Sequence, residues 1–415
     1  MDKHLVKHEL NEAELLGTIK KLDELEHDDG VVQMLGSYDE ILTYNFLVPK
    51  NDKTKLLSMI MIDISRGREP SEYETKFLDE IDSRFIAHKD KKDFTPRETL
   101  CLFMKEYWDI KNKYSFLEMC KTPEIAADVT MLPVDLLGID AAILFSDILV
   151  TAEAMGGDLT FEQGVGPRFS NPIRSVKDAE ALSVNCLDKL QYVGDAIKVI
   201  QQRLDNRIPL IGFAGAPFTI LSYLVEGGSS KDFKLTKLML NNQPELAHLI
   251  LQKIADVTVE YLNMQIAAGV NAIQLFDSWA LALSWNDYRD FSHYYNKQII
   301  SKLNRKDIPV ISFCKGSSVF APMMVEAQPD VVSIDWNADL KNIKQSLPQG
   351  VAVQGNLDPF VLYADKPVIK KKIIELFERM RGEHGFIFNL GHGIMPDIPF
   401  DHVKYAIEVV KEFRY

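Results

Sequence analysis

Five polar residues of types that can take part in chemistry end or follow short apolar runs: Asp147, Ser278, Lys315, Asn337 and His392. A carboxylate such as Asp147 can act as a base, bind a metal, accept several N–H donors or simply cap a helix. Glycines flank His392 on both sides, and they allow the backbone to approach a ligand closely. Ser278 lacks the G-x-S-x-G pattern of a nucleophile elbow, so we expect it to form hydrogen bonds rather than attack a substrate.

Tyr223 is a further candidate, because it follows a glycine- and proline-containing turn that predicts the start of a helix. A phenol on that helix can donate a hydrogen bond to a substrate oxygen, or it can pack into the core. The spacing alone leaves both interpretations open.

The apolar runs that precede these residues predict the elements that position them. Runs of this length, rich in Val, Ile and Phe, are typical of strands buried on both faces of a sheet. Most intervening segments carry helical patterns, which indicates a parallel sheet. We therefore expect an α/β fold, a (β/α)8 barrel with one strand unassigned, in which chemistry takes place at the C-terminal strand ends. The seven predicted strands are residues 141–147, 210–216, 272–278, 309–316, 331–337, 351–357 and 385–391.

Helical patterns and turn residues fill in the rest of the barrel. Residues 150–170 contain several glycines and are predicted to be a long loop at the mouth of the barrel. The predicted helices are residues 123–129, 244–265, 285–304, 366–382 and 399–413.

The N-terminal part has a different texture and is predicted to be a separate unit. We expect residues 1–92 to form a helical extension and residues 93–415 to form the barrel. The extension contains no catalytic constellation, and structural packing is favoured over a role in binding or assembly. Its predicted helices are residues 11–27, 37–47, 55–66 and 70–85.

Composition excludes several classes of function. The chain has 415 residues and a net charge of −13, which argues against a nucleic-acid partner. No apolar run approaches the roughly 20 residues of a membrane helix, and the N-terminus lacks the apolar stretch of a secretory signal. The scattered cysteines include no C-x-x-C pair, so we expect a cytoplasmic protein without a disulfide framework and without a metal site. They are Cys101, Cys120, Cys186 and Cys314.

Several motifs, in order and spacing, closely resemble the uroporphyrinogen decarboxylase family from about residue 110 to the C-terminus. They are FLEMCKTPEIAADVT, LGIDAAILFSDIL, GVGPRFSNPIR, LIGFAGAPFT, SYLVEGGSS, NAIQLFDSWA, QGNLDP and NLGHGI. The resemblance implies a single (β/α)8 barrel that works as a homodimer without metal or organic cofactor. It also implies an activity: removal of the four acetate carboxyl groups of uroporphyrinogen III to give coproporphyrinogen III, in haem and other tetrapyrrole synthesis.

The resemblance also assigns roles to individual residues. It makes Asp147 the central carboxylate that accepts hydrogen bonds from the pyrrole N–H groups. Such a carboxylate stabilises the cation formed when a pyrrole carbon is protonated. Tyr223 matches a tyrosine close to this carboxylate, and His392 matches a histidine that contacts substrate carboxylates or orients the macrocycle. The residues with an implied role in substrate binding are Ser278, Phe276, Phe145 and Gly215.

One segment departs from the family pattern. The family carries Met-Arg-Gln-Ala-Gly-Arg-Tyr at its first strand, with two arginines expected to hold substrate carboxylates. Residues 95–108 here read TPRETLCLFMKEYW, in which neither arginine has an equivalent. Residues 99–104 can form the missing strand or continue the N-terminal helices. The segment is explained either by a foreign N-terminal piece joined to a truncated decarboxylase, or by divergence.

Two alternative functions remain open from the sequence. A diverged homologue with little activity would serve as a binding or structural protein, which the absence of the arginines favours. A corrinoid methyltransferase-like enzyme is less well supported. That family binds zinc through His-x-Cys and a later cysteine, whereas Ser312 stands at the histidine position here and no cysteine follows Cys314.

Overall fold

The computed structural model describes residues 31–33, 45–47, 104–162, 166–395 and 397–414. The chain divides into two compact units, Met1–Asp90 and Lys91–Tyr415. The predicted division of roles between residues 1–92 and 93–415 stays a prediction.

The described residues of the first unit form a small antiparallel ribbon. Strand β1 (Val31–Gln33) pairs with β2 (Asn45–Leu47). The predicted helix at residues 37–47 is therefore wrong over its last three residues. The Val-Val and Asn-Phe-Leu sequences of the two strands contain branched and aromatic residues that favour extended backbone. The other predicted helices of the extension lie outside the described residues.

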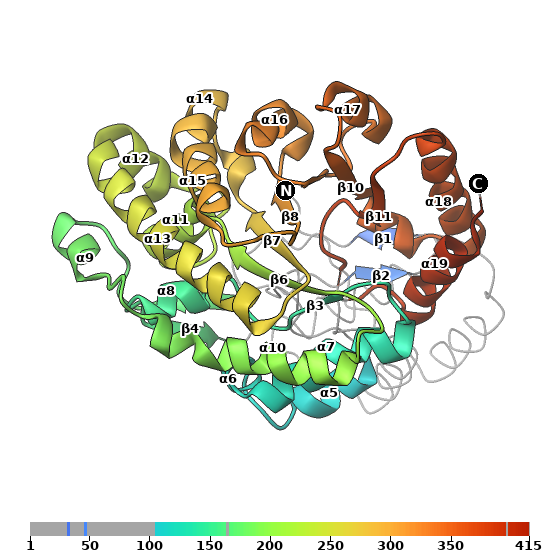
Figure 1. The fold of residues 1–415 in the computed structure, drawn as a ribbon, viewed down its shortest axis with the longest axis horizontal. Helices are drawn as coiled ribbons and strands as arrows, with labels where there is room; N and C mark the ends of the chain where they lie inside the picture. Colours follow the sequence, from blue (N-terminus) through green and yellow to red (C-terminus); the bar gives the residue numbers. More distant parts are fainter. Residues whose placement is uncertain (1–30, 34–44, 48–103, 163–165, 396, 415) are drawn as a thin grey trace, which may run out of the picture. The chain divides into compact units, whose positions relative to one another are not determined.

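A parallel sheet of seven strands, in simple sequence order, forms the centre of the second unit. All seven predicted strands are confirmed, although the first is only two residues long. Figure 1 shows that the sheet is curled, with helices along its outer side. The strands are β3 (Ala142–Ile143), β6 (Leu210–Gly215), β7 (Ala272–Asp277), β8 (Val310–Cys314), β9 (Val331–Ser333), β10 (Ala352–Leu357) and β11 (Phe386–Leu390).

The place of the eighth barrel strand lies between β3 and β11. Within the described part of the chain no strand joins these two edges of the sheet. Most of the candidate segment 99–104 lies outside the described residues, and Met104 is the N-cap of α5 (Lys105–Lys111).

The predicted helices are confirmed, with changes in length. Residues 285–304 are divided into α14 (Trp285–Tyr288), a π-helical turn η3 (Arg289–His293) and α15 (Tyr294–Lys302). The other helices that flank the sheet are α7 (Pro123–Leu137), α10 (Gln191–Leu204), α11 (Pro217–Glu226), α13 (Pro244–Ala268), α16 (Ser317–Met324), α17 (Leu340–Ser346), α18 (Lys366–Met380) and α19 (Phe400–Glu412). In the described part of the chain no helix combines the length and apolar character needed to cross a bilayer.

The segment predicted as a long loop, residues 150–170, has regular structure instead. It contains helix α8 (Val150–Ala154), followed by strands β4 (Leu159–Glu162) and β5 (Gly166–Phe169), which pair antiparallel. The prediction gave weight to the glycines, whereas the alternation of apolar and polar residues in Leu-Thr-Phe-Glu favours a strand.

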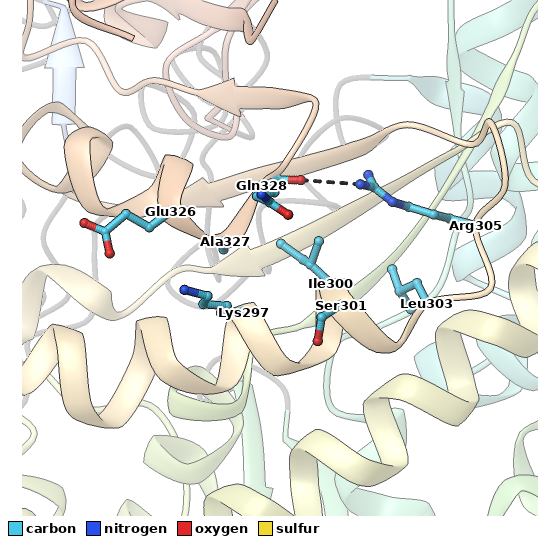
Figure 2. A pocket seen from close by; sticks show the side chains of 8 residues that line it. All are labelled: Lys297, Ile300, Ser301, Leu303, Arg305, Glu326, Ala327 and Gln328. Carbon is cyan, nitrogen blue, oxygen red and sulfur yellow. Dashed lines mark hydrogen bonds between the residues drawn. The ribbon is translucent and has the colours of Figure 1, made fainter. Parts of the chain in front are cut away.

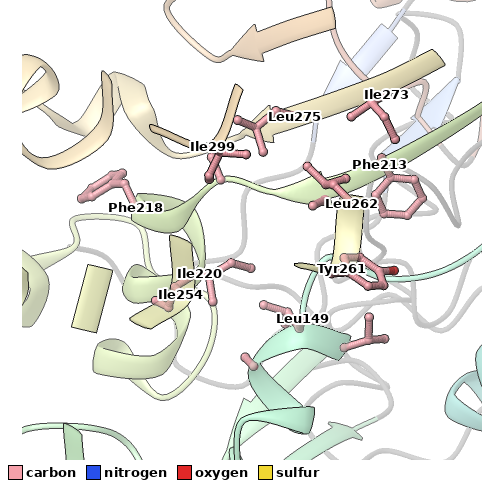
Figure 3. Close-up of a cluster of buried hydrophobic side chains, with 14 of the residues drawn as sticks. Leu149, Phe213, Phe218, Ile220, Ile254, Tyr261, Leu262, Ile273, Leu275 and Ile299 are labelled. Carbon is pink, nitrogen blue, oxygen red and sulfur yellow. The ribbon is translucent and has the colours of Figure 1, made fainter. Parts of the chain in front are cut away.

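The core fills the space between the sheet and its helices. Figure 3 shows Ile273 and Leu275 of β7 in one cluster with Ile254 and Leu262 of α13. Because strand side chains alternate between faces, Phe276 then lies on the opposite face of β7. At the end of the strand, one residue therefore faces the helices and the next faces the opposite side of the sheet. The candidate site uses residues on that opposite side.

Candidate active site

Parallel pairing brings the C-terminal ends of the strands to one edge of the sheet. Asp147, Ser278 and His392 follow β3, β7 and β11 respectively, so three candidates from distant parts of the chain share this edge. This is the edge at which α/β barrels bind their substrates.

Asp147 is a buried carboxylate with only 2% of its surface exposed. The backbone N–H of Leu149 donates a hydrogen bond to its Oδ1 at 2.7 Å. The backbone just before it is fixed by a second contact, in which the N–H of Phe145 donates to Oγ1 of Thr130, on α7, at 2.9 Å. A carboxylate held in this way in a buried position interacts strongly with a developing positive charge.

Tyr223 lies on α11, which begins with Pro217 immediately after β6. The side chain is 8% exposed, and its ring lies 5.9 Å from that of Trp279, which follows β7. The helix predicted for this tyrosine is confirmed. The indole of Trp279 is tilted by 55° to the tyrosine ring, and its contact restricts the orientation of that ring.

Aromatic rings form a continuous row across the sheet. The centroid of the Phe276 ring lies 6.0 Å from that of Phe213 on β6 and 5.9 Å from that of Phe313 on β8. Phe313 in turn lies 6.1 Å from the imidazole of His392, which also contacts Trp336 edge-on at 6.1 Å. The row joins Phe276 to His392 and gives this face of the sheet an apolar wall.

His392 is a partly buried imidazole at the end of this row. Burial lowers its pKa, and the positive charge of Lys315 lowers the pKa further. A backbone hydrogen bond with Gly393 and the negative charge of Asp335 oppose this shift but do not reverse it. The imidazole is therefore neutral at neutral pH and has one N–H donor and one acceptor nitrogen.

Two predicted contact residues lie in packed surroundings. The ring of Phe145 is buried against that of Phe116, and the two ring centroids are 5.8 Å apart. A Cβ atom on Gly215 would lie 2.9 Å from Ile148 and 2.7 Å from Ile220. Phe145 and Gly215 thus have clear structural reasons for their identity. Ser278 is half-buried directly after β7.

The deciding comparison is with protein families. A family model described as uroporphyrinogen decarboxylase (URO-D) matches residues 87–413. The chain belongs to the uroporphyrinogen decarboxylase family. The match begins before the resembling motifs, which start near residue 110, and it spans the segment that lacks the arginine pair.

Curated relatives agree with this family membership. A uroporphyrinogen decarboxylase of Protochlamydia amoebophila is 47% identical over 312 residues, which are 75% of this chain and 85% of the relative. One of Chloroherpeton thalassium is 45% identical over 316 residues, with 75% and 90% of the two chains covered. Among solved structures, a methyltransferase from Methanosarcina mazei has a TM-score of 0.62 at 21% identity and covers 74% of this chain and 90% of its own. That likeness concerns the fold alone.

The sequence did not identify the carboxylates that support this decarboxylase-family site. Asp277 is 1% exposed and accepts hydrogen bonds from Oγ1 of Thr219, at 2.7 Å, and from the hydroxyl of Ser292. Burial raises the pKa of the Asp277 carboxyl above its ordinary value, although these hydrogen bonds oppose the change. Asp277 therefore connects β7 to α11 and η3, directly behind Phe276.

Asp335, near His392, is a second buried carboxylate that links segments by accepting hydrogen bonds. Its Oδ2 accepts the backbone N–H of Gly316 at 2.8 Å, and its Oδ1 accepts the Ser318 hydroxyl. The apolar run was predicted to extend to Asn337, whereas β9 ends at Ser333. The signal for Asp335 was present, because an acidic residue directly after a short buried strand is a candidate for this edge.

The described residues hold no group of three or more His, Cys, Asp or Glu side chains that could bind a metal ion. The thiol of Cys314 is buried, with its Sγ 3.5 Å from Sδ of Met324. Burial raises the pKa of this thiol, so the free Cys314 side chain is protonated at neutral pH.

A cavity of about 290 Å³ lies away from the candidate site. Figure 2 shows that its lining comes from the end of α15, including Ile300, and from η4 (Val325–Ala327) and its neighbour Gln328. These segments lead into β8 and β9, so the cavity is at the N-terminal edge of the sheet. This edge of an α/β barrel contributes to stability rather than to chemistry.

Proposed function

We propose that this chain removes the four acetate carboxyl groups of uroporphyrinogen III and yields coproporphyrinogen III. The observation that carries the proposal is the buried carboxylate of Asp147 at the C-terminal edge of the sheet, in a chain 47% identical to a decarboxylase of that name. The catalytic residues in this proposal are Asp147, Tyr223 and His392. Phe276 and Ser278 contact the macrocycle or its side chains.

The proposed chemistry follows from the charges in the site. A proton adds to a pyrrole ring carbon beside the acetate side chain, and the ring becomes a cation that the Asp147 carboxylate stabilises. The bond between the methylene and the carboxylate then breaks, CO2 leaves, and the bonding electrons neutralise the ring. A proton added to the methylene carbon, with loss of the first proton from the ring, leaves a methyl group. Each cycle consumes one proton and releases one CO2.

Two side chains have supporting tasks in this scheme. The neutral imidazole of His392 can donate a hydrogen bond to a substrate carboxylate. Because it is uncharged, it adds no positive charge to that of the cationic pyrrole ring. The phenol of Tyr223, on α11, is oriented by Trp279, which follows β7. Phe276, which packs edge-to-face against Phe213 and Phe313, supplies apolar surface against which a pyrrole ring can pack.

Anaerobic turnover tests the proposal. Purified protein is incubated with uroporphyrinogen III, and the products are oxidised to porphyrins and separated by chromatography. We expect products with seven, six, five and four carboxyl groups, and stoichiometric CO2. No product above the no-enzyme background would refute the decarboxylase proposal.

A second candidate function is binding without turnover. The observation that favours it is the absence of the family's arginine pair from residues 95–108. Titration with uroporphyrin, followed by quenching of porphyrin fluorescence, separates the two functions. Binding in the absence of any turnover would favour a binding protein, whereas binding with turnover favours the enzyme.

We also propose that the protein is a cytoplasmic homodimer. Leu281, Trp285 and Val319 are large apolar side chains with 50%, 47% and 57% of their surface exposed. They lie close together, since Leu281 borders Gly316 and the Trp285 ring contacts Phe320. Exposed apolar groups that cluster in this way are typical of contact surfaces. The buried free thiols of Cys120, Cys186 and Cys314 suit a reducing compartment.

Sedimentation equilibrium tests the homodimer. We expect a mass twice that of the chain, and Val319→Asp is expected to shift the population toward monomer. Val368→Asp, at an exposed valine of α18, is the matched control. A monomeric wild-type protein would contradict the homodimer without affecting the activity proposal.

A further inference from the structure

The proposed substrate raises a question of charge. Uroporphyrinogen has eight carboxylates, and this chain has a net charge of −13 and no arginine pair in residues 95–108. An anionic ligand of this kind needs cations at the site, because carboxylates lose their hydration on entering a partly buried cleft. Such cations are expected at the C-terminal edge of the sheet, where the proposed site lies.

Lys315 is the residue that directly follows β8. Its backbone N–H donates to the carbonyl oxygen of Asp277 at 3.2 Å, and Cys314 pairs with Asp277 in the sheet. Lys315 is thus the neighbour of Ser278 across the β7–β8 pair. It is half-buried, and its charge acts on the imidazole of His392. Lys315 therefore lies at the part of the edge between two of the proposed site residues.

The ammonium group of Lys315 forms no salt bridge with any residue that the structure describes. The two buried carboxylates that flank it have other donors. Asp277 accepts from Thr219 and Ser292, and Asp335 accepts from the Gly316 N–H and the Ser318 hydroxyl. A half-buried ammonium group that forms no salt bridge with the described residues can take an anionic ligand as its partner.

We infer that Lys315 binds a side-chain carboxylate of the porphyrinogen, beside Ser278 and His392, and supplies positive charge in place of the arginine pair that is absent from residues 95–108. This inference rests on the proposed function. Lysine binds as a point charge rather than as a bidentate fork, so it tolerates carboxylates at different positions. Its effect is on substrate binding rather than on the chemical step.

The test is the variant Lys315→Met, which keeps the length and apolar stem of the side chain. We expect KM for uroporphyrinogen III to rise by about 10- to 100-fold, with a much smaller change in kcat. Lys315→Arg is expected to retain most of the affinity. Lys297→Met, at an exposed lysine beside the cavity on the opposite edge, is the charge-matched control and should leave KM unchanged. Circular dichroism and thermal unfolding of all three variants verify the fold.

Fluorescence titration with uroporphyrin separates failure of this inference from failure of the proposed function. If wild-type protein turns over substrate and Lys315→Met changes neither KM nor the uroporphyrin Kd, the inference is overturned and the function stands. If wild-type protein lacks turnover, the proposed function fails. A Kd weakened about 10-fold or more by Lys315→Met, and not by Lys297→Met, would then still support Lys315 as the carboxylate-binding residue. An unchanged Kd would reject it.

Discussion

Charged side chains are buried at one edge of the parallel sheet and exposed at the other. At the C-terminal edge Asp147, Asp277 and Asp335 are almost completely buried. At the N-terminal edge the charged residues are partly or largely exposed and form ion pairs, such as Arg305 with Asp330, which precede β8 and β9. Buried carboxylates are expensive to maintain, whereas exposed ion pairs cost little and contribute little. The difference indicates which edge is built for binding and chemistry and which one for solubility and modest stability.

The strongest test of this comparison is Asp147→Asn, which removes a charge from the C-terminal edge with almost no change in shape. We expect kcat to fall by at least about 100-fold, because the cationic ring would lose its carboxylate partner. Anaerobic turnover measures the loss, and urea unfolding shows whether the fold persists. Asp330→Asn at the other edge is the control and should retain activity. Full activity of Asp147→Asn would remove this residue from the mechanism.

A second prediction concerns Gly215, which the resemblance places in substrate binding and the structure places in tight packing. In Gly215→Ala the added methyl group meets Ile148 and Ile220. We expect a loss of about 1 to 3 kcal/mol in the free energy of unfolding from this overpacking. Activity should fall with it, because Ile148 is adjacent to Asp147. A variant of wild-type stability with weakened substrate binding would instead favour direct contact between Gly215 and the substrate.

A third prediction concerns the titration of His392. Its pKa is lowered in the folded protein, so folding favours the neutral imidazole. The corresponding stability is fully present above the unfolded pKa of about 6.5 and is lost as the pH falls through the lower, folded value. NMR titration of the His392 ring protons should give a midpoint below 6.5, and Lys315→Met should raise it. A midpoint that does not move in this variant would contradict the electrostatic contact between Lys315 and His392.

Much of the fold could be predicted from the sequence, because strands buried on both faces leave unbroken apolar runs. All seven runs are strands, and their C-terminal ends alone predict one shared edge for Asp147, Ser278 and His392. The supporting carboxylates could not be predicted in the same way. The role of Asp277 depends on Thr219 and Ser292, which are distant in sequence and approach only when α11 and η3 pack on the sheet.

The errors in the predictions have equally specific causes. The hairpin of β4 and β5 was predicted as a loop because glycines dominate the segment, although its short alternating pattern was the better guide. The helix predicted through Leu47 ended as strand β2, whose pairing with β1 depends on a partner twelve or more residues away. Single-segment patterns do not contain the partner, so they cannot distinguish a short strand from a helix end.

The smallest predicted effect is at the N-terminal edge. The side chains of Arg305 and Asp330 are 28% and 48% exposed, so water and salt screen their ion pair. We expect Arg305→Ala to change the free energy of unfolding by less than about 1 kcal/mol and to leave kcat and KM unaltered. Urea unfolding at low and high salt measures the first quantity. A large loss of activity in this variant would mean that the two edges are coupled, and the division between a chemical and a structural edge would no longer hold.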